Sequence, residues 1–446
     1  QGWRLACKAV TREAVEIVVP VQEQQGFSAL AAEAADEGAL SLAADHDYGL
    51  AVDIGTTTLA AALVDCTDGK ILATATAVNS QRSFGADVVS RIGAACHGKG
   101  KALQKAVRRD LTRLMKQLLK DHPGTAARCR QMAIAANTTM LHLLMGWPCD
   151  GLGDWPFHPV SLGGKTYRAQ EVLGPQSPLA DATVTLLPGM STYVGADITA
   201  GIWQCGLASS DDVSLFVDLG TNGEMVLGNK DQRFIASAPA GPALEGGKLT
   251  WGTGSVPGAI CGVRIERGRA KVRTIDHAVP VGICGTGILE AMAGLVREGL
   301  VDETGKLVEP YFHKGFPLAS TLDYQRITLS QQDIREIQMA KSAIRAGIES
   351  LIERSGISRQ RVHQVFLAGG FGYYLDPQKA AVIGLLPADL AERTTAVGNT
   401  SLKGAIGLLT GAVTLEELQA IAAGVEEIVL GNDEAFQRLY IDYLNF

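Results

Sequence analysis

The sequence predicts an α/β protein made of two similar lobes with a ligand cleft between them. Strand patterns alternate with helix patterns along the 446 residues, which is the arrangement of α/β folds. A turn rich in glycine and threonine or asparagine follows an apolar strand twice, at Asp53 and at Asp218, and this offset of 165 residues (218 − 53) is the length of one domain. Glycine accounts for 51 of the 446 residues, which is typical of folds with many tight turns.

Charge and hydropathy exclude several classes of function. The formal net charge is −7 and the lysines and arginines form no runs, which argues against nucleic acid or an anionic membrane surface as the main partner. No apolar stretch approaches the roughly 20 residues that a transmembrane helix needs. We therefore expect a cytoplasmic protein that binds neither nucleic acid nor membrane. The chain begins with Gln1 rather than Met, so we expect it to be a piece of a longer polypeptide.

The eight cysteines lie at least 20 residues apart and form no Cys-x-x-Cys pair. This spacing argues against a zinc ribbon, a self-contained iron–sulfur site and a disulfide framework. We therefore expect reduced cysteines.

The first lobe is expected between residues 48 and 206. Residues 1–20 end in a short strand pattern closed by Pro20, and residues 21–47 read as a linker because they carry neither helix caps nor a strand period. The lobe then reads as two strands, an amphipathic helix, a strand and a helix, at 50–54, 59–64, 101–120, 132–136 and 138–145.

The second lobe is expected between residues 207 and 446, with its last helices completing the first lobe. Its opening strand, 215–219, repeats the pattern of the strand at 50–54. Ser330 and Asp333 form a capping box that predicts the start of a long helix, which Gly356 ends. The other expected elements are helices at 283–298, 401–409, 415–423 and 434–444 and a buried strand at 365–368.

Each repeated turn places an aspartate at a strand end, followed by glycine and small polar residues. Such a turn exposes N–H and hydroxyl donors to one concavity, which suits phosphate oxygens, and the aspartate can hold Mg²⁺ through its waters. A single turn of this kind is common in hairpins, whereas two copies one domain apart favour a function. The predicted phosphate-binding residues are Thr56, Thr57, Thr58, Gly220, Thr221, Asn222 and Gly223, with Asp53 and Asp218 at the metal.

Two other phosphate motifs are excluded by single residues. The segment 163–166 looks like the end of a P-loop, but the position of its first glycine holds Pro159. The dinucleotide fingerprint fails at the Gly-x-Gly segments 252–254 and 285–287, because the position of its third glycine holds Pro257 in the first and Glu290 in the second.

A pair of glycines, Gly369 and Gly370, ends the strand predicted at 365–368. Without a β carbon, such residues let a ligand lie against the backbone. An ordinary glycine turn before a helix is the alternative.

These three elements resemble, in order and spacing, the phosphate-one, phosphate-two and adenosine motifs of the actin-like ATPase superfamily, which includes sugar kinases, heat-shock chaperone ATPases and actin. The resemblance implies a duplicated, ribonuclease H-like fold. Residues 193–201 and 399–407 look like its two connecting helices, whose small residues let the helices cross closely at a hinge. The resemblance also implies that Asp197 positions the attacking water, unless it is an exposed aspartate at a helix start. Gln338 and Lys341 match positions that contact ribose and adenine in heat-shock chaperones, with a solvated helix face as the alternative.

A narrower set of segments looks like the reductive activators of corrinoid proteins. The segments are Leu50–Val64, Phe84–Val88, Ala136–Met140, Tyr193–Ile198 and Gly241–Gly246. Members of that family join an N-terminal plant-type [2Fe–2S] ferredoxin domain to an actin-like ATPase. The segment from Gly2 to Cys7 resembles the last cluster-binding stretch of such a domain, so Cys7 is implied as the fourth cluster ligand, with an ordinary buried cysteine as the alternative. Because the other three cysteines of that motif are missing, we expect this chain to bind no cluster.

The resemblance implies a function: ATP and Mg²⁺ drive the reduction of a corrinoid protein from inactive Co(II) to Co(I), with electrons that reach it from an external donor through the [2Fe–2S] domain. Asp197 and Asp218 are the implied catalytic residues. A small-molecule kinase and a non-catalytic ATP-binding scaffold are the alternatives. The sequence leaves open the corrinoid partner, its methyl donor, the docking surface and the oligomeric state, a homodimer included.

Overall fold

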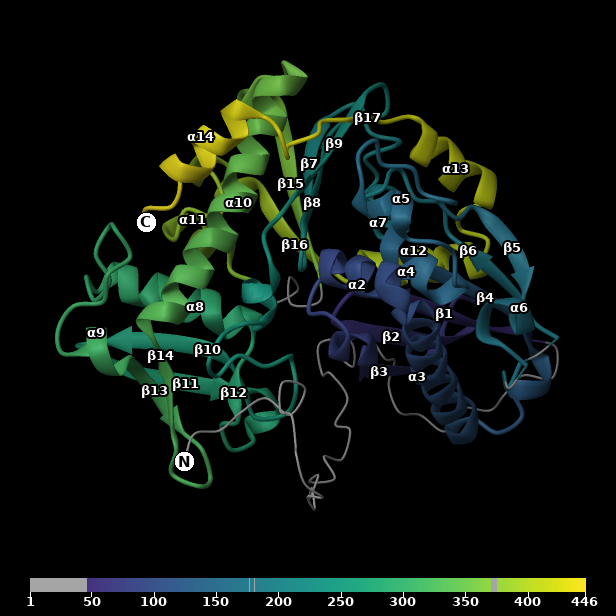
Figure 1. The fold of residues 1–446 in the computed structure, drawn as a ribbon, viewed down its shortest axis with the longest axis horizontal. Coiled ribbons are helices and arrows are strands. Elements are labelled where there is room, and N and C mark those ends of the chain that lie inside the picture. Colours follow the sequence, from purple (N-terminus) through teal and green to yellow (C-terminus); the bar gives the residue numbers. More distant parts are fainter. Residues whose placement is uncertain (1–45, 176, 180, 370–374) are drawn as a thin grey trace.

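Two lobes lie side by side in the computed structural model, which describes residues 46–175, 177–179, 181–369 and 375–446 (Figure 1). The purple and blue part of the chain forms the first lobe, and the teal and green part forms the second. The yellow C-terminal part contributes helices to both. None of the helices in these ranges combines the length and the apolar character that crossing a membrane requires.

The first lobe is built on a six-stranded sheet with the order β3-β2-β1-β4-β6-β5. Strand β1 pairs antiparallel with β2 and parallel with β4. The strands are β1 (Tyr48–Ile54), β2 (Thr58–Asp65), β3 (Ile71–Val78), β4 (Cys129–Ala136), β5 (Lys165–Arg168) and β6 (Thr183–Leu186).

The second sheet repeats this order. It runs β16-β15-β7-β8-β9-β17, so β9-β8-β7-β15-β16 corresponds to β3-β2-β1-β4-β6 of the first lobe, with the same antiparallel and parallel pairings. The predicted duplicated fold is therefore confirmed. The strands are β7 (Val213–Leu219), β8 (Gly223–Gly228), β9 (Arg233–Ala238), β15 (Val362–Ala368), β16 (Thr394–Gly398) and β17 (Glu426–Glu427).

The period of two along β1 explains how its sheet is covered on both faces. Leu50, Val52 and Ile54 point into a large apolar core under the outer helices, whereas Ala51 faces the other lobe in a second core. The outer elements are η2 (Ser80–Ser83), α2 (Val88–Ala94), η3 (Ala95–Lys99), α3 (Gly100–Asp121), η4 (Ala126–Arg128), α4 (Thr138–Met145), α5 (Asp150–Gly153) and α6 (Ala169–Leu173). The predicted apolar stripe of α3 is buried as expected.

The outer face of the second sheet is covered by the long helix α10 (Gln331–Ser355). It begins at the predicted capping box, in which Ser330 caps the helix and Asp333 returns the hydrogen bonds, and it ends at Gly356, whose φ of 67° is left-handed. Helix α14 (Glu434–Asp442) packs against α10. The short elements of this region are η7 (Arg359–Arg361), α11 (Pro377–Val382) and η9 (Ala388–Arg393).

The residues between β9 and α10 in the sequence form a smaller part of the second lobe. Most of its strands and short helices were not predicted from the sequence. Its strands are short and partly exposed: in β11 every residue is either exposed or only partly buried, so the sequence has no apolar run there. Helix α8 (Gly285–Arg297) was predicted correctly. The remaining elements are η5 (Pro242–Glu245), β10 (Ala259–Glu266), β11 (Arg269–Thr274), η6 (Ile275–His277), β12 (Gly282–Ile283), α9 (Tyr311–Lys314), β13 (Phe316–Ser320) and β14 (Arg326–Leu329).

Helices α7 (Ala196–Gln204) and α12 (Thr400–Leu409) cross between the two sheets, joined by α13 (Leu415–Ala423). The crossing is close because its contact residues are small: a β carbon on Gly404 would lie 2.8 Å from the Cα of Ala200. Helix α12 packs on β1 and β4, although it comes far later in the chain. The C-terminal part of the sequence therefore completes the inner core of the first lobe.

Candidate functional site

A cavity that is open to solvent lies between the lobes and is lined by both repeated turns. The first turn, 55–58, we call loop 1, and the second, 220–222, loop 2. Eight predicted residues, together with Asp197 and Gly369, lie in its wall: Asp53, Thr56, Thr57, Thr58, Asp218, Gly220, Thr221 and Asn222. Gly223 lies outside the lining, buried at the start of β8 against Ile344.

Loop 1 is held by side chains of the layer behind it. Its turn closes by a hydrogen bond from the Gly55 N–H to the Thr58 carbonyl (3.0 Å). The buried amide of Asn79 donates to the Gly55 carbonyl (2.9 Å), and Asn137 donates to the Thr56 hydroxyl (3.1 Å). A β carbon on Gly55 would lie 2.6 Å from the Thr58 oxygen, so this turn requires glycine.

Loop 2 is tightened in the same way by a hydrogen bond from the Gly220 N–H to the Asn222 carbonyl (3.1 Å). The end of β15 approaches it closely at Gly369, whose φ is 115°. A β carbon there would lie 2.5 Å from the Leu219 carbonyl oxygen and 3.1 Å from an Asp218 carboxylate oxygen. The glycine predicted from the strand end is therefore needed for this close approach. Gly370 lies outside the described residues.

Five carboxylates meet at the cavity: Asp53, Asp197, Asp218, Glu224 and Glu245. Burial raises the pKa of each of them. Neighbouring carboxylates raise the pKa further for Asp197, which reaches about 7 beside Asp53, and for Asp218 and Glu224. Among the described residues that line the cavity there is no Lys, Arg or His. No positively charged side chain of the described lining therefore balances the negative charge of these carboxylates.

Asp53 is oriented by the start of α12. Asn399 donates to one carboxylate oxygen (2.8 Å) and Ser401 to the other (2.9 Å). Asn399 also caps α12 by accepting a hydrogen bond from the Leu402 N–H (2.8 Å). The hinge helix and the Asp53 carboxylate are thus fixed by the same residue.

Glu245 links the two loops across the cleft. One of its carboxylate oxygens accepts hydrogen bonds from the hydroxyls of Thr57, in the first lobe (3.2 Å), and Thr221, in the second (2.6 Å). The sequence shows the segment around Glu245 as part of the family resemblance, but it indicates no role for this side chain. The same holds for Asn137, Asn399 and Ser401, and Glu224 has no sequence signal beyond its place after loop 2.

Gln338 and Lys341 lie on α10 outside the cavity lining and are covered by the C-terminal segment. The Gln338 amide donates to the carbonyls of Thr304 (3.1 Å) and Leu444 (2.8 Å). The Lys341 ammonium donates to the Asn445 carbonyl and lies 4.9 Å from the centre of the Phe446 ring. Contact of these two residues with adenine and ribose stays a prediction, and it requires the C-terminal segment to move.

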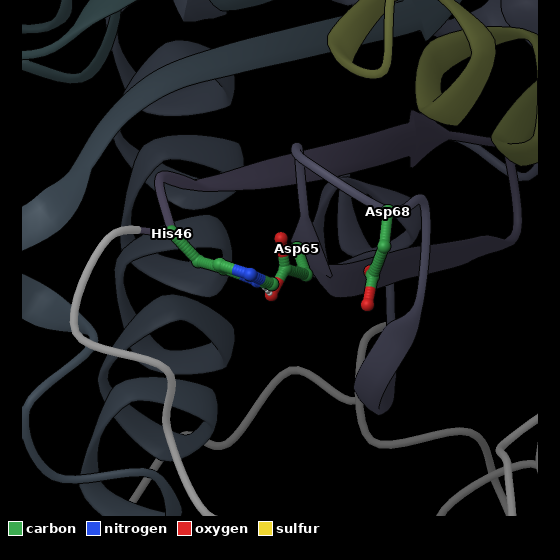
Figure 2. Close-up of side chains that lie close together, drawn as sticks. All are labelled: His46, Asp65 and Asp68. Atoms are coloured by element: carbon green, nitrogen blue, oxygen red, sulfur yellow. Dashed lines mark hydrogen bonds and ion pairs between the residues drawn. The ribbon is translucent and has the colours of Figure 1, made fainter.

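Cys7 is outside the described residues. A cluster of His46, Asp65 and Asp68 places its ligand atoms within 4.8 Å of one another, as Figure 2 shows. The cluster lies at the end of β2 opposite to loop 1, and hydrogen bonds from His46 and from the Thr67 N–H already engage Asp65. We assign it no metal.

A duplicated sheet of this order, with two turns facing one cleft, defines an actin-like ATPase fold. Residues 212–446 match the family described as the C-terminal domain of RACo, the ASKHA domain, and residues 48–210 match the RACo middle region. The chain belongs to the RACo family.

Named relatives agree with this membership. The chain is 33% identical to the corrinoid activation enzyme RamQ of Eubacterium limosum, over 88% of this chain and 69% of the relative. It is 25% identical to a [Co(II) methylated amine-specific corrinoid protein] reductase of Methanosarcina barkeri, over 90% of this chain and 77% of the relative. A solved structure, a reductive activator for a corrinoid iron–sulfur protein, matches 91% of this chain with a TM-score of 0.85 and 34% identity, and the match covers 67% of that protein.

Proposed function

We propose that this chain is the ATP-hydrolysing part of a reductive activator that returns a corrinoid protein from Co(II) to Co(I). The observation that carries the proposal is the single cavity in which loops 1 and 2, from opposite lobes, face the same five carboxylates. The names of the relatives support a corrinoid protein as the partner. ATP as the driving ligand is supported by the ASKHA fold.

The donor set of the cavity fits Mg²⁺. Carboxylate and hydroxyl oxygens are the ligands that this ion prefers, and the lining offers neither sulfur nor imidazole among its described residues. In this proposal Asp53 and Asp218 hold the ion, and the ion neutralises charge on the phosphates. A divalent cation also reduces the repulsion between the triphosphate and the five acidic side chains that line the cavity.

The remaining residues position the nucleotide and water. The N–H groups and hydroxyls of loops 1 and 2 bind phosphate oxygens, because phosphoryl transfer needs positioning and charge neutralisation more than covalent chemistry. Asp197 orients the attacking water, and a pKa raised to about 7 by burial and by Asp53 suits a group that accepts a proton near neutral pH. The nucleoside lies beside Gly369, the residue of the implied adenosine motif that lines the cavity.

The energetics of such coupling are adequate. Inverting a two-state population from 1:99 to 99:1 takes about 5.5 kcal/mol. For a one-electron couple, 59 mV corresponds to a factor of ten, so the same 10⁴-fold bias corresponds to about 240 mV. One nucleotide therefore suffices to shift the Co(II)/Co(I) balance usefully if lobe closure changes the state of the bound partner. The electrons come, in this proposal, from an external donor through a [2Fe–2S] domain whose fourth ligand is Cys7.

The test is phosphate release from Mg-ATP, with and without a Co(II) corrinoid protein, followed together with the visible spectrum of the corrinoid. We expect the corrinoid protein to stimulate release, and Asp218→Asn to abolish it without changing the melting temperature. Asp231→Asn, an exposed residue of the same lobe, is the matched control and should behave as wild type. Phosphorylation of an added sugar or acid would instead indicate a kinase, and nucleotide binding without release would indicate a scaffold.

A further inference from the structure

Arg91 is a buried cation with an unused donor, placed behind loop 1. It is fully buried on α2, where its Nε donates to the Gly85 carbonyl (3.0 Å) and its Nη1 contacts the Met140 sulfur (3.4 Å). Its Nη2 has no hydrogen-bond partner in the part of the chain that the structure describes. Burial lowers the pKa of Arg91 to about 10, so the side chain is still charged at neutral pH. A buried guanidinium nitrogen without an acceptor is costly and calls for a partner that arrives in another state.

Met140 connects this guanidinium to loop 1. Its sulfur accepts from both Arg91 and Asn79 (3.7 Å), and Asn79 in turn donates to the Gly55 carbonyl. Arg91 therefore belongs to the layer that supports the phosphate-type turn of the first lobe. It is not part of the cavity lining, so the geometry does not present it to a phosphate directly.

Two acidic groups act on Arg91: Asp87, which caps its own helix, and Glu245, which comes from the other lobe. Burial lowers the pKa of Arg91, and the charges of Asp87 and then Glu245 raise it; Arg91 in turn favours the ionised form of Glu245. The described residues form no ion pair between Arg91 and Glu245, and one oxygen of the Glu245 carboxylate, Oε2, accepts from the hydroxyls of Thr57 and Thr221.

We infer that Glu245 is an interlobe positioning residue that exchanges the hydroxyls of Thr57 and Thr221 for the guanidinium of Arg91 when Mg-ATP enters. The inference rests on the proposed function. The phosphate oxygens take the two hydroxyls, so Glu245 loses both donors. It is then left beside Asp218 and the triphosphate, whose charges repel it. Pairing with the free Nη2 of Arg91 removes both penalties, and it replaces a hydrogen-bonded bridge by an ion pair between η5 and α2. Nucleotide binding thereby changes the contact between the lobes, because Glu245 then binds α2 of the first lobe instead of loop 1.

A double-mutant cycle in nucleotide affinity tests this exchange. The proteins are wild type, Arg91→Met, Glu245→Gln and the double variant, titrated with a fluorescent ATP analogue in the presence of Mg²⁺. If the ion pair forms only in the bound state, Arg91→Met weakens affinity about tenfold in the wild-type background, which corresponds to about 1.4 kcal/mol. In the Glu245→Gln background the same substitution changes affinity less than twofold, because no carboxylate remains to pair.

Two further variants guard against a merely structural effect. Arg91→Lys keeps a positive charge and should recover most of the lost affinity. Arg108→Met removes a partly buried arginine of the same lobe, whose hydrogen bonds to described residues go to the carbonyls of Leu144 and Glu171, and it should leave affinity unchanged. If Arg91→Met does not fold, as judged by its melting curve, the cycle is run with Arg91→Lys and Arg91→Gln.

The outcomes separate the two proposals. An equal loss of affinity in both backgrounds overturns the exchange, because Arg91 then acts on the nucleotide without Glu245. A crystal structure with a bound Mg-ATP analogue that leaves Glu245 on Thr57 and Thr221 overturns it as well. A wild-type protein that binds no Mg-ATP overturns the proposed function, and the exchange with it.

Discussion

The crossing of α7 and α12 leaves no room for a side chain at Gly404. A β carbon there would lie 2.8 Å from the Cα of Ala200, whereas carbon atoms in contact lie about 3.5–4.0 Å apart. The Cβ of Ala200 would lie even nearer, at 2.3 Å, so Gly404→Ala requires the helices to separate by about 1.2 Å (3.5 − 2.3). Both helices are packed against sheets and cannot shift freely. Overpacking of this kind costs up to about 3 kcal/mol. Alanine gains about 1 kcal/mol over glycine in a helix, which leaves a net loss of about 2 kcal/mol.

Thermal unfolding followed by circular dichroism measures this loss. For a chain of 446 residues the entropy of unfolding is about 0.9 kcal/mol/K, so each kcal/mol shifts the melting temperature by about 1 °C. We therefore expect the melting temperature of Gly404→Ala to fall by roughly 2 °C. Gly93→Ala is the matched control, because a β carbon at this position of α2 meets nothing within 4 Å. It should melt at or slightly above the wild-type temperature. Adding Ala200→Gly to Gly404→Ala removes the opposing methyl group and should recover part of the loss. A Gly404→Ala protein that melts like wild type would refute the close crossing.

Three more predictions concern the site and the C-terminal cover. Ser401→Ala removes one of the donors to Asp53, and we expect the Mg²⁺ concentration for half-maximal nucleotide binding to rise about tenfold in a titration. An unchanged requirement would show that the Ser401 hydrogen bond does not tune a metal at Asp53. Burial lowers the pKa of Lys341 from 10.5 to about 8, so the unfolded chain binds more protons between pH 8 and 10.5 and stability rises with pH in this window, by up to about 3 kcal/mol. The urea midpoint of wild type should therefore gain on that of Lys341→Met between pH 7.5 and 10, and parallel pH curves would contradict the burial. Asn79→Ala leaves the Gly55 carbonyl without its donor and should lower stability by about 1–3 kcal/mol in the same assay, whereas an unaffected midpoint would show that loop 1 does not depend on this amide.

The parts of the fold that the sequence predicts are those with local causes. The apolar strand before Asp53 and its copy before Asp218 show the duplication, because a buried strand and a tight turn are each visible within about ten residues. The start of α10 follows from two residues three positions apart, Ser330 and Asp333, that satisfy each other's backbone donors. These local sequence patterns predict the element without knowledge of the contacts that it makes with distant residues.

The parts that were missed depend on contacts between distant residues. Glu245 and Thr57 are 188 positions apart, and no spacing rule links them before the lobes are brought together. Gln338 and Lys341 have polar side chains at a suitable place on α10, but the C-terminal segment, about 104–106 residues further on, supplies their carbonyl partners. Helix propensity and periodicity predict α10 itself, but they do not show that the C-terminal segment covers it.

The family regions meet between residues 210 and 212, yet the molecule cannot be cut there cleanly. Helix α12 returns from the C-terminal region to cover the alanine-lined inner face of the first sheet, and α13 packs on α7 beside it. A fragment ending at 210 would leave that face bare, and we expect it to aggregate when produced alone. Co-expression with the complementary fragment should restore a stable heterodimer, because the missing helices would then be supplied in trans. For this protein, the boundary between the two family regions is therefore not a suitable boundary for producing a stable fragment.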